Sequence, residues 1–264
     1  MSRQNYYARR QQRQRREVEG DLVAQLVQRE RQLQPRLGTR KLHHLLQSEL
    51  RQAGVWLGRD RLFKELRRRD LLLKPLPALF PRTTQFYPTL PVFKNLLKER
   101  DVKRPNEAWV SDITYLRTRE GFQYLSLITD RYSRKVVGWH VADTLETEGC
   151  LRALEVALAG LPAGSRPIHH SDRGCQYCSH EYVQRLQDRG LAISMTETDH
   201  CAENALAERM NGILKQEYGL GLEFASKALV RAAVKQGIEL YNTRRPHTAL
   251  DYRVPATVHQ AALD

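Results

Sequence analysis

Three carboxylates stand at positions where a metal site could form. Asp112 interrupts the run Ala-Trp-Val-Ser-Asp-Ile-Thr-Tyr-Leu, which is otherwise β-branched and aromatic, and Asp172 follows a predicted strand at 167–171. Glu208 lies on a helix predicted to begin near residue 203, and the 35 residues 173–207 separate it from Asp172. An ionised carboxylate is costly to bury in a strand unless a cation meets it. The three acids, from two strands and one helix, therefore predict a divalent-metal site.

The segments around these acids predict a mixed sheet with helices on its faces. The strand that carries Asp112 is followed by strands at 122–129 and 135–141, and tight turns join them. Short consecutive strands of this kind predict an antiparallel meander. Helices and strands then alternate: a helix at 146–159, the strand at 167–171, a helix at 179–189, a short strand at 191–195 and the Glu208 helix. This order predicts an α/β domain with the architecture of the ribonuclease H-like fold.

Two other glutamates, Glu203 and Glu217, lie on or beside the Glu208 helix. At about 100° per residue, one stripe of apolar side chains must face the core: Leu206, Met210, Ile213 and Leu214. Glu217 falls on that stripe and Glu203 near it, whereas Glu208 shares the opposite face with Asn211 and Lys215. That face is either an ordinary solvated surface or a line of side chains directed at a DNA backbone. In the second case Asn211 and Lys215 contact DNA.

Two further features resemble functional groups but have simpler explanations. Asp130 ends a predicted strand at a turn, where aspartate is common, so we expect a structural role and a pairing with Arg131 or Arg134. Cys175 and Cys178 have the spacing of a zinc-binding pair, but no second pair with finger-like spacing exists. No zinc is therefore expected, although further ligands could come from His169, His180, His200 or Cys201.

Positive charge is concentrated in the first 104 residues. They contain 25 Lys and Arg against 10 Asp and Glu, a net charge of +15, whereas residues 105–264 contain 18 and 20, a net charge of −2. This asymmetry predicts a polyanion-binding region joined to a nearly neutral domain, although a basic surface also aids solubility. The sequence shows no apolar run of the roughly 18–20 residues that span a bilayer, no apolar signal-peptide core and only four cysteines. A cytoplasmic protein without membrane contact is therefore expected.

Residues 1–84 are predicted to form a basic arm and a helix-turn-helix DNA-binding region. Residues 1–16 are rich in Arg and Gln without apolar periodicity, so we expect an arm that is flexible or orders on binding. A helix at 17–33 precedes two shorter helices, the first capped by Thr39 and the second beginning near Arg59. Helical hairpins are common, but a basic second helix suits DNA binding. The candidate DNA contacts are Arg40, Lys41, Arg59, Arg61, Lys64 and Arg68.

The rest of the chain is expected to contain three parts. A proline-containing linker is predicted at 85–105, because prolines recur between residues 75 and 105. The α/β core is predicted at 106–225, and a helical extension at 226–264. Pro246 and Pro255 should confine the end of that extension to short pieces.

Five blocks of sequence, in this order, resemble a known family. They are Trp109-Val-Ser-Asp-Ile-Thr-Tyr, Asp130-Arg-Tyr-Ser-Arg, His170-Ser-Asp-Arg-Gly-Cys-Gln-Tyr, Glu203-Asn-Ala-Leu-Ala-Glu-Arg-Met-Asn-Gly-Ile-Leu-Lys and Tyr241-Asn-Thr-Arg-Arg-Pro-His-Thr-Ala-Leu. Together they resemble bacterial insertion-sequence transposases with a retroviral-integrase-like core, in particular the second-reading-frame product of the insertion sequence three family. The resemblance covers nearly the whole chain, and its small departures, at Cys175, Glu203 and Met210, leave the three acids intact.

The resemblance implies an Asp-Asp-Glu triad of Asp112, Asp172 and Glu208 that uses magnesium, with manganese as a substitute. Such a site would cleave DNA at the terminal inverted repeats of the element and join the freed 3′ hydroxyl to target DNA. Two metal ions about 4 Å apart can activate the attacking oxygen and stabilise the leaving oxygen. Without metal, two carboxylates about 5 Å apart repel by roughly 3 kcal/mol at an effective dielectric of about 20. Without metal, the three carboxylates should therefore be spread apart or partly protonated.

The resemblance also implies double-stranded DNA as the partner and a homo-oligomer on that DNA, in association with the bacterial nucleoid. It further implies a possible fusion with the product of an upstream first reading frame. Two other functions stay open: a DNA-binding regulator whose core is catalytically dead, and a ribonuclease H-like nuclease that cuts without joining.

Overall fold

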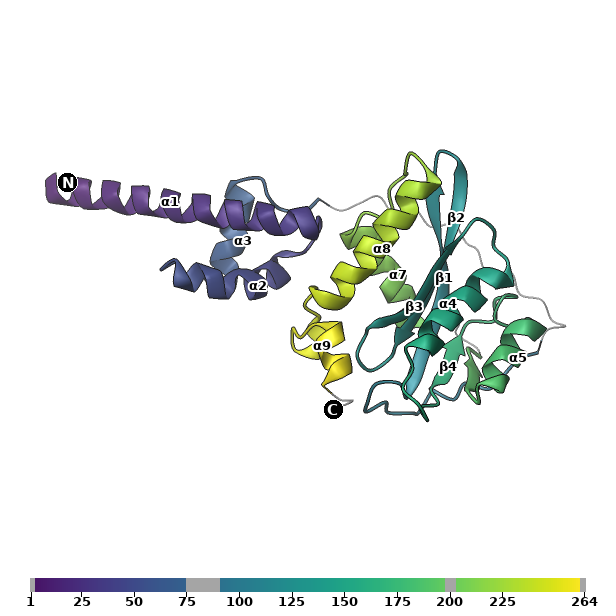
Figure 1. Cartoon of the computed structure of the whole chain (residues 1–264). Helices are drawn as coiled ribbons and strands as arrows, with labels where there is room; N and C mark the ends of the chain where they lie inside the picture. The colour runs from purple at the N-terminus through teal and green to yellow at the C-terminus, as the bar shows by residue number, and fades with distance from the viewer. Residues whose placement is uncertain (1–2, 75–90, 198–202, 262–264) are drawn as a thin grey trace. The chain divides into compact units, whose positions relative to one another are not determined.

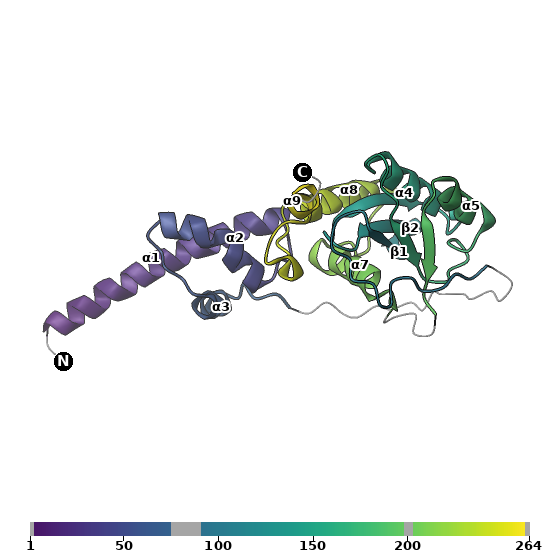
Figure 2. The same ribbon diagram turned by 90° about the horizontal axis from the view of Figure 1, so that it is seen from below.

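The computed structural model describes residues 3–74, 91–197 and 203–261, and the chain divides into two units, Met1–Pro77 and Ala78–Asp264 (Figures 1 and 2). The predicted boundary at 84/85 lies outside the described residues. The first unit is helical and the second is α/β. The two units are described separately below.

The first unit contains α1 (Arg3–Leu33), α2 (Thr39–Gln52) and α3 (Arg59–Arg68). Its core is an apolar cluster to which all these helices contribute, with Val27, Leu42 and Leu62 fully buried. The turn after α2 passes through Gly54, whose φ of 74° favours glycine. The predicted pair of short helices is therefore confirmed. One detail differs, because Gly38 occupies the N-cap position of α2 and Thr39 is the first helical residue.

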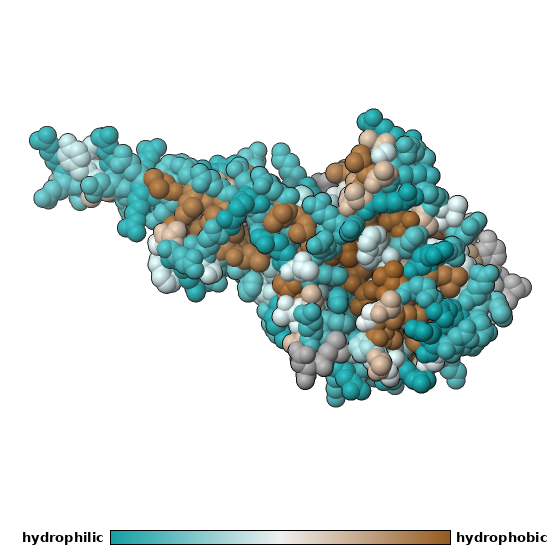
Figure 3. Space-filling view, in the orientation of Figure 1, coloured by the Kyte–Doolittle hydropathy of each residue, from teal (hydrophilic) through white to brown (hydrophobic). Residues whose placement is uncertain are grey.

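The arm expected at 1–16 to be flexible or to order on binding is helical in its described residues, because α1 is one continuous helix from Arg3. Every residue from Arg3 to Val18 is exposed. In both ribbon views α1 continues past α2 and α3, and Figure 3 shows this part as mostly hydrophilic. Apolar periodicity is missing here because no partner covers this half of α1. Ala, Arg and Gln are good helix formers, so they extend a helix that is stabilised by packing further along.

The second unit is built on a sheet with the strand order β3-β2-β1-β4-β5. β1 (Ala108–Thr118), β2 (Gly121–Asp130) and β3 (Val136–Ala142) form the predicted antiparallel meander. β4 (Ile168–Ser171) pairs in parallel with β1, and β5 (Ala192–Met195) pairs in parallel with β4. This mixed sheet confirms the predicted ribonuclease H-like architecture.

Helices cover both faces of this sheet. α4 (Thr147–Ala159) and α5 (His180–Asp188) pack on one face, in an apolar cluster that includes Trp109. The approach of α4 needs a glycine in β3, because a Cβ at Gly138 would lie 2.3 Å from the Ala153 carbonyl oxygen. α7 (Ala205–Glu217) and α8 (Lys227–Thr243) pack on the other face. A 3₁₀ turn, Thr248–Leu250, and α9 (Pro255–Gln260) follow as the predicted short pieces.

The C-terminal part of the chain belongs to the core of the second unit. Val230, Val234 and Tyr241 of α8 are fully buried in the same apolar cluster as Leu125 of β2. The segment 226–264 was expected as an extension of a core that ends at residue 225. The described part of it instead completes that core.

Residues 91–105, the described part of the expected linker, also pack on the second unit. Leu97 is 4% exposed and lies in an apolar cluster with Val110 of β1 and Ala207 of α7. The backbone N–H of Leu96 donates to Ser194 Oγ at 2.8 Å. Proline excludes regular structure, but it does not prevent an irregular segment from packing. The linker assignment is therefore wrong for these residues.

Asp130 is structural, as expected, but its partners differ from those predicted. It is fully buried and accepts hydrogen bonds from Asn106 N, Ser133 N and Ser133 Oγ, each at 2.7 Å. Burial opposes its ionisation, but the nearby His259 and hydrogen bonds from Ser133 and Asn106 hold its pKa below the usual value. Among the described contacts, Asp130 forms no ion pair with Arg131 or Arg134, because the turn folds back on itself through Ser133.

Candidate active site

The parallel pairing of β1 and β4 brings Asp112 and Asp172 to the same place. The register pairs Trp109 with His169 and Val110 with His170. Asp112 lies two residues after Val110, and Asp172 lies two residues after His170, so the two acids occupy corresponding positions. Because side chains alternate along a strand, both acids continue the row that starts at Val110 and His170. β4 ends at Ser171, which places Asp172 at the start of the loop beside β1.

Asp112 is half-buried and has an unusual pKa. Its Oδ1 accepts a hydrogen bond from Ile113 N at 2.9 Å, and its Oδ2 accepts one from Asn211 Nδ2 at 2.7 Å. The pKa is nevertheless raised to about 7, because burial disfavours the ionised form and the negative charges of Asp172 and Glu208 add to that effect. All three acids therefore lie close enough to interact.

Asp172 and Glu208 complete the acidic group from different elements. Asp172 Oδ1 accepts a hydrogen bond from Gly174 N at 3.0 Å, within the loop that follows β4. Glu208 is exposed in the first turn of α7, whose packed side is formed by Met210, Leu214 and neighbouring residues. Within the described ranges, no three acidic, histidine or cysteine side chains are placed to hold one metal ion. The charges of the three carboxylates interact, but the three side chains do not form such a group.

Glu203 and Glu217, the other two candidates for the third acid, bind groups outside the acidic site. Glu203 Oε2 accepts hydrogen bonds from Asn95 Nδ2 at 3.0 Å and from Glu197 N at 2.5 Å. Glu217 forms a bidentate ion pair with Arg245, at 2.7 and 2.8 Å. Of the three glutamates, Glu208 is the one whose charge raises the pKa of Asp112.

The polar face of α7 docks against β1, which corrects the role expected for Asn211. Asn211 is 6% exposed and its amide binds Asp112, so it supports the acidic site and is not available to a DNA surface. Asn204 is also buried and donates to the Ser111 carbonyl oxygen at 3.1 Å. Lys215 is half-buried; burial lowers its pKa, and the charge of Asp112 opposes that shift. The sequence signal for Asn211 was its position one turn after Glu208.

Comparison with known proteins decides the family. Integrase core domain models match residues 102–201 and 189–255. A Shigella sonnei protein, the insertion element IS600 uncharacterized 31 kDa protein, is 35% identical over 225 residues, which cover 84% of this chain and 81% of that protein. The transposase InsF for insertion sequence IS3A of Escherichia coli (strain K12) is 37% identical over 206 residues, 77% of this chain and 71% of that protein. This chain belongs to the insertion-sequence transposases with an integrase core domain.

The fold of this transposase also resembles that of viral integrases. A chain in the simian T-cell lymphotropic virus intasome, in complex with PP2A regulatory subunit B56 gamma, superposes with a TM-score of 0.52. The superposition covers 84% of this chain and 74% of that chain, at 18% sequence identity. At that identity the likeness concerns the fold alone.

The cysteine pair of the transposase lies beside the acidic loop. Cys178 is buried in the core, with its Sγ 3.8 Å from Met195 Sδ, and burial raises its pKa to about 11. Cys175 is half-buried in the loop itself. His169 hydrogen-bonds Ser111 and Tyr182, whereas His200 and Cys201 lie outside the described residues.

None of the described helices is long and apolar enough to cross a membrane.

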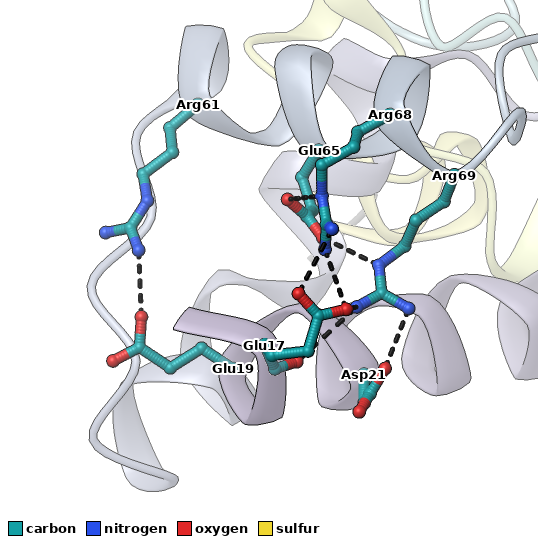
Figure 4. A network of polar contacts seen from close by, with 7 residues as sticks. All are labelled: Glu17, Glu19, Asp21, Arg61, Glu65, Arg68 and Arg69. Carbon is teal, nitrogen blue, oxygen red and sulfur yellow. Dashed lines mark hydrogen bonds and ion pairs between the residues drawn. The ribbon is translucent and has the colours of Figure 1, made fainter. Parts of the chain in front are cut away.

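The predicted DNA contacts in the first unit of the transposase fall into two groups. Arg40, Arg59 and Lys64 are exposed, and Lys41 is half-buried. Arg61 and Arg68 are exposed as well, but they also form ion pairs with carboxylates of α1 (Figure 4). The sequence could not show these pairs, because the partners lie more than 40 positions apart.

Proposed function

We propose that this transposase cleaves DNA at the ends of its insertion sequence and joins the freed 3′ ends to target DNA, with Asp112, Asp172 and Glu208 as the catalytic acids. The observation that carries this proposal is geometric: β1 and β4 pair in parallel just before Asp112 and Asp172, and Asn211 of the Glu208 helix donates a hydrogen bond to Asp112. Three elements that are far apart in the chain, β1, the loop after β4 and α7, bring the charges of these acids together. A structural role would not call for three mutually repelling carboxylates.

The residues present fit magnesium. All three candidate ligands offer carboxylate oxygens, which Mg²⁺ prefers, and Mn²⁺ would substitute for it. Burial and then the charges of Asp172 and Glu208 raise the pKa of Asp112, and a divalent cation would favour its ionised form. Asp112, Asp172 and Glu208 would hold the metal, which supplies positive charge to activate the attacking oxygen and stabilise the leaving one.

Side chains around the acids have supporting roles in this proposal. The Asn211 amide holds one oxygen of Asp112 and favours its ionised form. Lys215 adds a positive charge near Asp112, suited to a DNA phosphate. Ile113 N holds the second oxygen of Asp112, so that carboxylate is oriented before any ligand arrives.

The partner in this proposal is double-stranded DNA, both the terminal inverted repeats and the target. Support comes from the basic first unit, the names of the transposase relatives and the intasome neighbour. We also propose that the chain acts as a homo-oligomer on DNA, in the bacterial cytoplasm and near the nucleoid. Fusion with the product of an upstream reading frame belongs to the same proposal.

A supercoiled plasmid that carries the terminal inverted repeats tests this function. With Mg²⁺, the proposal predicts cleavage at the repeat ends and joined products in which the 3′ ends are linked to a new strand. Nicks without joined products would favour a nuclease instead. Binding without any product, in both Mg²⁺ and Mn²⁺, would favour a DNA-binding regulator with an inactive core.

A further inference from the structure

The arginines of α3 are used in two different ways. On the side that faces α1, ion pairs connect Arg61 to Glu19 at 2.8 Å, Arg68 to Glu17 at 3.1 Å and Arg69 to Asp21 at 2.8 Å. Glu65 of α3 joins the same network, at 2.8 Å from Arg68 and 2.6 Å from Arg69. Figure 4 shows these side chains pointing toward one another between the two helices. We call this group of seven residues the α1–α3 clamp.

The α1–α3 clamp is a poor surface for a polyanion. It contains three arginines and four carboxylates, so its net charge is −1. The helices also approach closely here, since a Cβ at Gly20 would lie 2.3 Å from Glu65 Oε1. A guanidinium whose donors are taken by carboxylates cannot also bind a phosphate or a guanine edge without losing those bonds.

The remaining exposed surface of α3 has the opposite character. Arg59, Lys64 and Arg67 are exposed, and Asp60, which pairs with Arg59 at 3.0 Å, is the acid among them. Phe63 is 40% exposed, with the Arg67 guanidinium 5.0 Å from its ring centre.

The turn before α3 extends this surface. Trp56 is 72% exposed, and the Arg51 guanidinium of α2 lies 5.6 Å from its ring centre. An exposed indole ring beside a guanidinium can stack on a base or lie against the DNA backbone. With Arg51 included, this surface carries four positive charges and one negative charge, so it attracts a polyanion where the clamp repels one.

We propose that the first unit contacts DNA through this free surface, which is made up of Arg51, Trp56, Arg59, Phe63, Lys64 and Arg67. Arg61, Arg68 and Arg69 instead hold α3 against α1 through their ion pairs. The inference rests on the proposed function to the extent that the partner is DNA. In a helix-turn-helix, residues in the N-terminal part of the second helix contact base edges; Arg59 begins α3, and Phe63 and Lys64 lie in its middle. Arginine or lysine suits guanine edges and phosphates, and an aromatic ring suits a thymine methyl group. The assignment adds Arg67 to the predicted contacts and removes Arg61 and Arg68.

Neighbouring arginines provide a matched test. Arg67→Gln and Arg68→Gln each remove one positive charge from adjacent positions of the full chain. Binding to a fluorescent duplex that carries the terminal inverted repeat is measured over a series of salt concentrations. Arg67→Gln should weaken binding about tenfold, and the slope of log affinity against log salt should become less negative by about 1. Arg68→Gln should leave the slope unchanged and lower the thermal unfolding temperature.

Further variants cover the case in which one substitution affects folding. Lys64→Gln, at an exposed position, should also reduce the slope by about 1. Trp56→Ala should weaken binding without changing the slope, because it removes no charge. The proposal is overturned if Arg68→Gln reduces the slope as much as Arg67→Gln does, or if Arg67→Gln and Lys64→Gln both bind like the wild type. Failure of the proposed function is a different result: the wild-type chain would then bind the duplex without salt dependence, or would bind it and form no joined products.

Discussion

Asn211 Nδ2 donates a hydrogen bond of 2.7 Å to Asp112 Oδ2, and this bond joins α7 to β1 inside the acidic site. The helix that carries Glu208 is thereby fastened to the strand that carries Asp112. Asn211 is 6% exposed, and its amide favours the ionised form of a carboxylate that burial and two neighbouring acids push toward protonation. The site therefore contains its own means of keeping Asp112 available to a cation.

We predict that Asn211→Leu moves the pH dependence of DNA cleavage to higher pH. Without the amide, the pKa of Asp112 rises further above about 7, so less of the carboxylate is ionised at neutral pH. Losing a hydrogen bond to a charged group costs about 1.5–3 kcal/mol, which corresponds to roughly a 10- to 100-fold loss of activity at pH 7. The pH–rate profile in Mg²⁺ measures the effect. Gln216→Leu, at an exposed position of α7, is the control, and an unchanged profile for Asn211→Leu would contradict the role given to the amide.

Compared with Asp112→Asn, the metal-free wild type should lose stability as pH rises from about 4 to about 7, whereas the buried His169 and His170, whose pKa values are lowered by burial, add stability with rising pH in both proteins. Asp112 has a higher pKa in the folded chain than in the unfolded chain, so the folded state holds its proton over that range and the unfolded state does not. One unit of pKa shift corresponds to about 1.4 kcal/mol, and the total is on the order of a few kcal/mol. Chemical denaturation in the presence of a chelator measures it. The free energy of unfolding of the wild type minus that of Asp112→Asn should fall over this pH range, and adding Mg²⁺ at pH 7.5 should stabilise the wild type but not that variant.

Asp130→Asn should destabilise the second unit without a separate effect on catalysis. The carboxylate is fully buried and accepts three hydrogen bonds, so the neutral amide leaves donors mismatched. We expect a loss of about 2–4 kcal/mol in the free energy of unfolding. Because hydrogen bonds lower the pKa of Asp130 in the folded state, its contribution is present at neutral pH and is lost as pH falls through the acid range. Asp143→Asn, in an exposed ion pair with Arg231, should cost less than about 1 kcal/mol; equal losses in the two variants would contradict this account.

The sequence predicted the elements of the acidic site because each acid interrupts a regular local pattern. Asp112 stands in an apolar strand, Asp172 ends one, and the strands and helices around them were found where expected. Helical periodicity predicted which face of α7 carries Asn211, but it could not show what that face packs against. A buried hydrogen-bond donor to Asp112 was therefore predicted to contact DNA. The same limit applies to Arg61 and Arg68, whose partners come from a different helix. Residues 91–105 were misassigned because their packing depends on Ser194 and Ala207, far along the chain.

Removal of residues 1–16 should weaken DNA binding mainly through its salt dependence. This half of α1 carries six arginines and no acid: Arg3, Arg9, Arg10, Arg13, Arg15 and Arg16. With about 8 phosphate contacts, the full chain should show a slope of about −7 for log affinity against log salt. If all six arginines contact phosphates, the slope of log affinity against log salt for the truncated chain should be less negative by about 5. Fluorescence anisotropy on one duplex measures both, and an unchanged slope would show that this part of α1 does not contact DNA.

The central claim, that Glu208 completes the catalytic triad, is tested most directly by Glu208→Gln in the plasmid assay with Mg²⁺. Glu239→Gln, at an exposed position of α8, is the matched control. We predict that Glu208→Gln abolishes both cleavage at the repeat ends and joining, while duplex binding and the unfolding temperature stay at wild-type values, and that Glu239→Gln retains full activity. Cleavage at the repeat ends by Glu208→Gln at a rate close to that of the wild type would contradict the assignment of the triad.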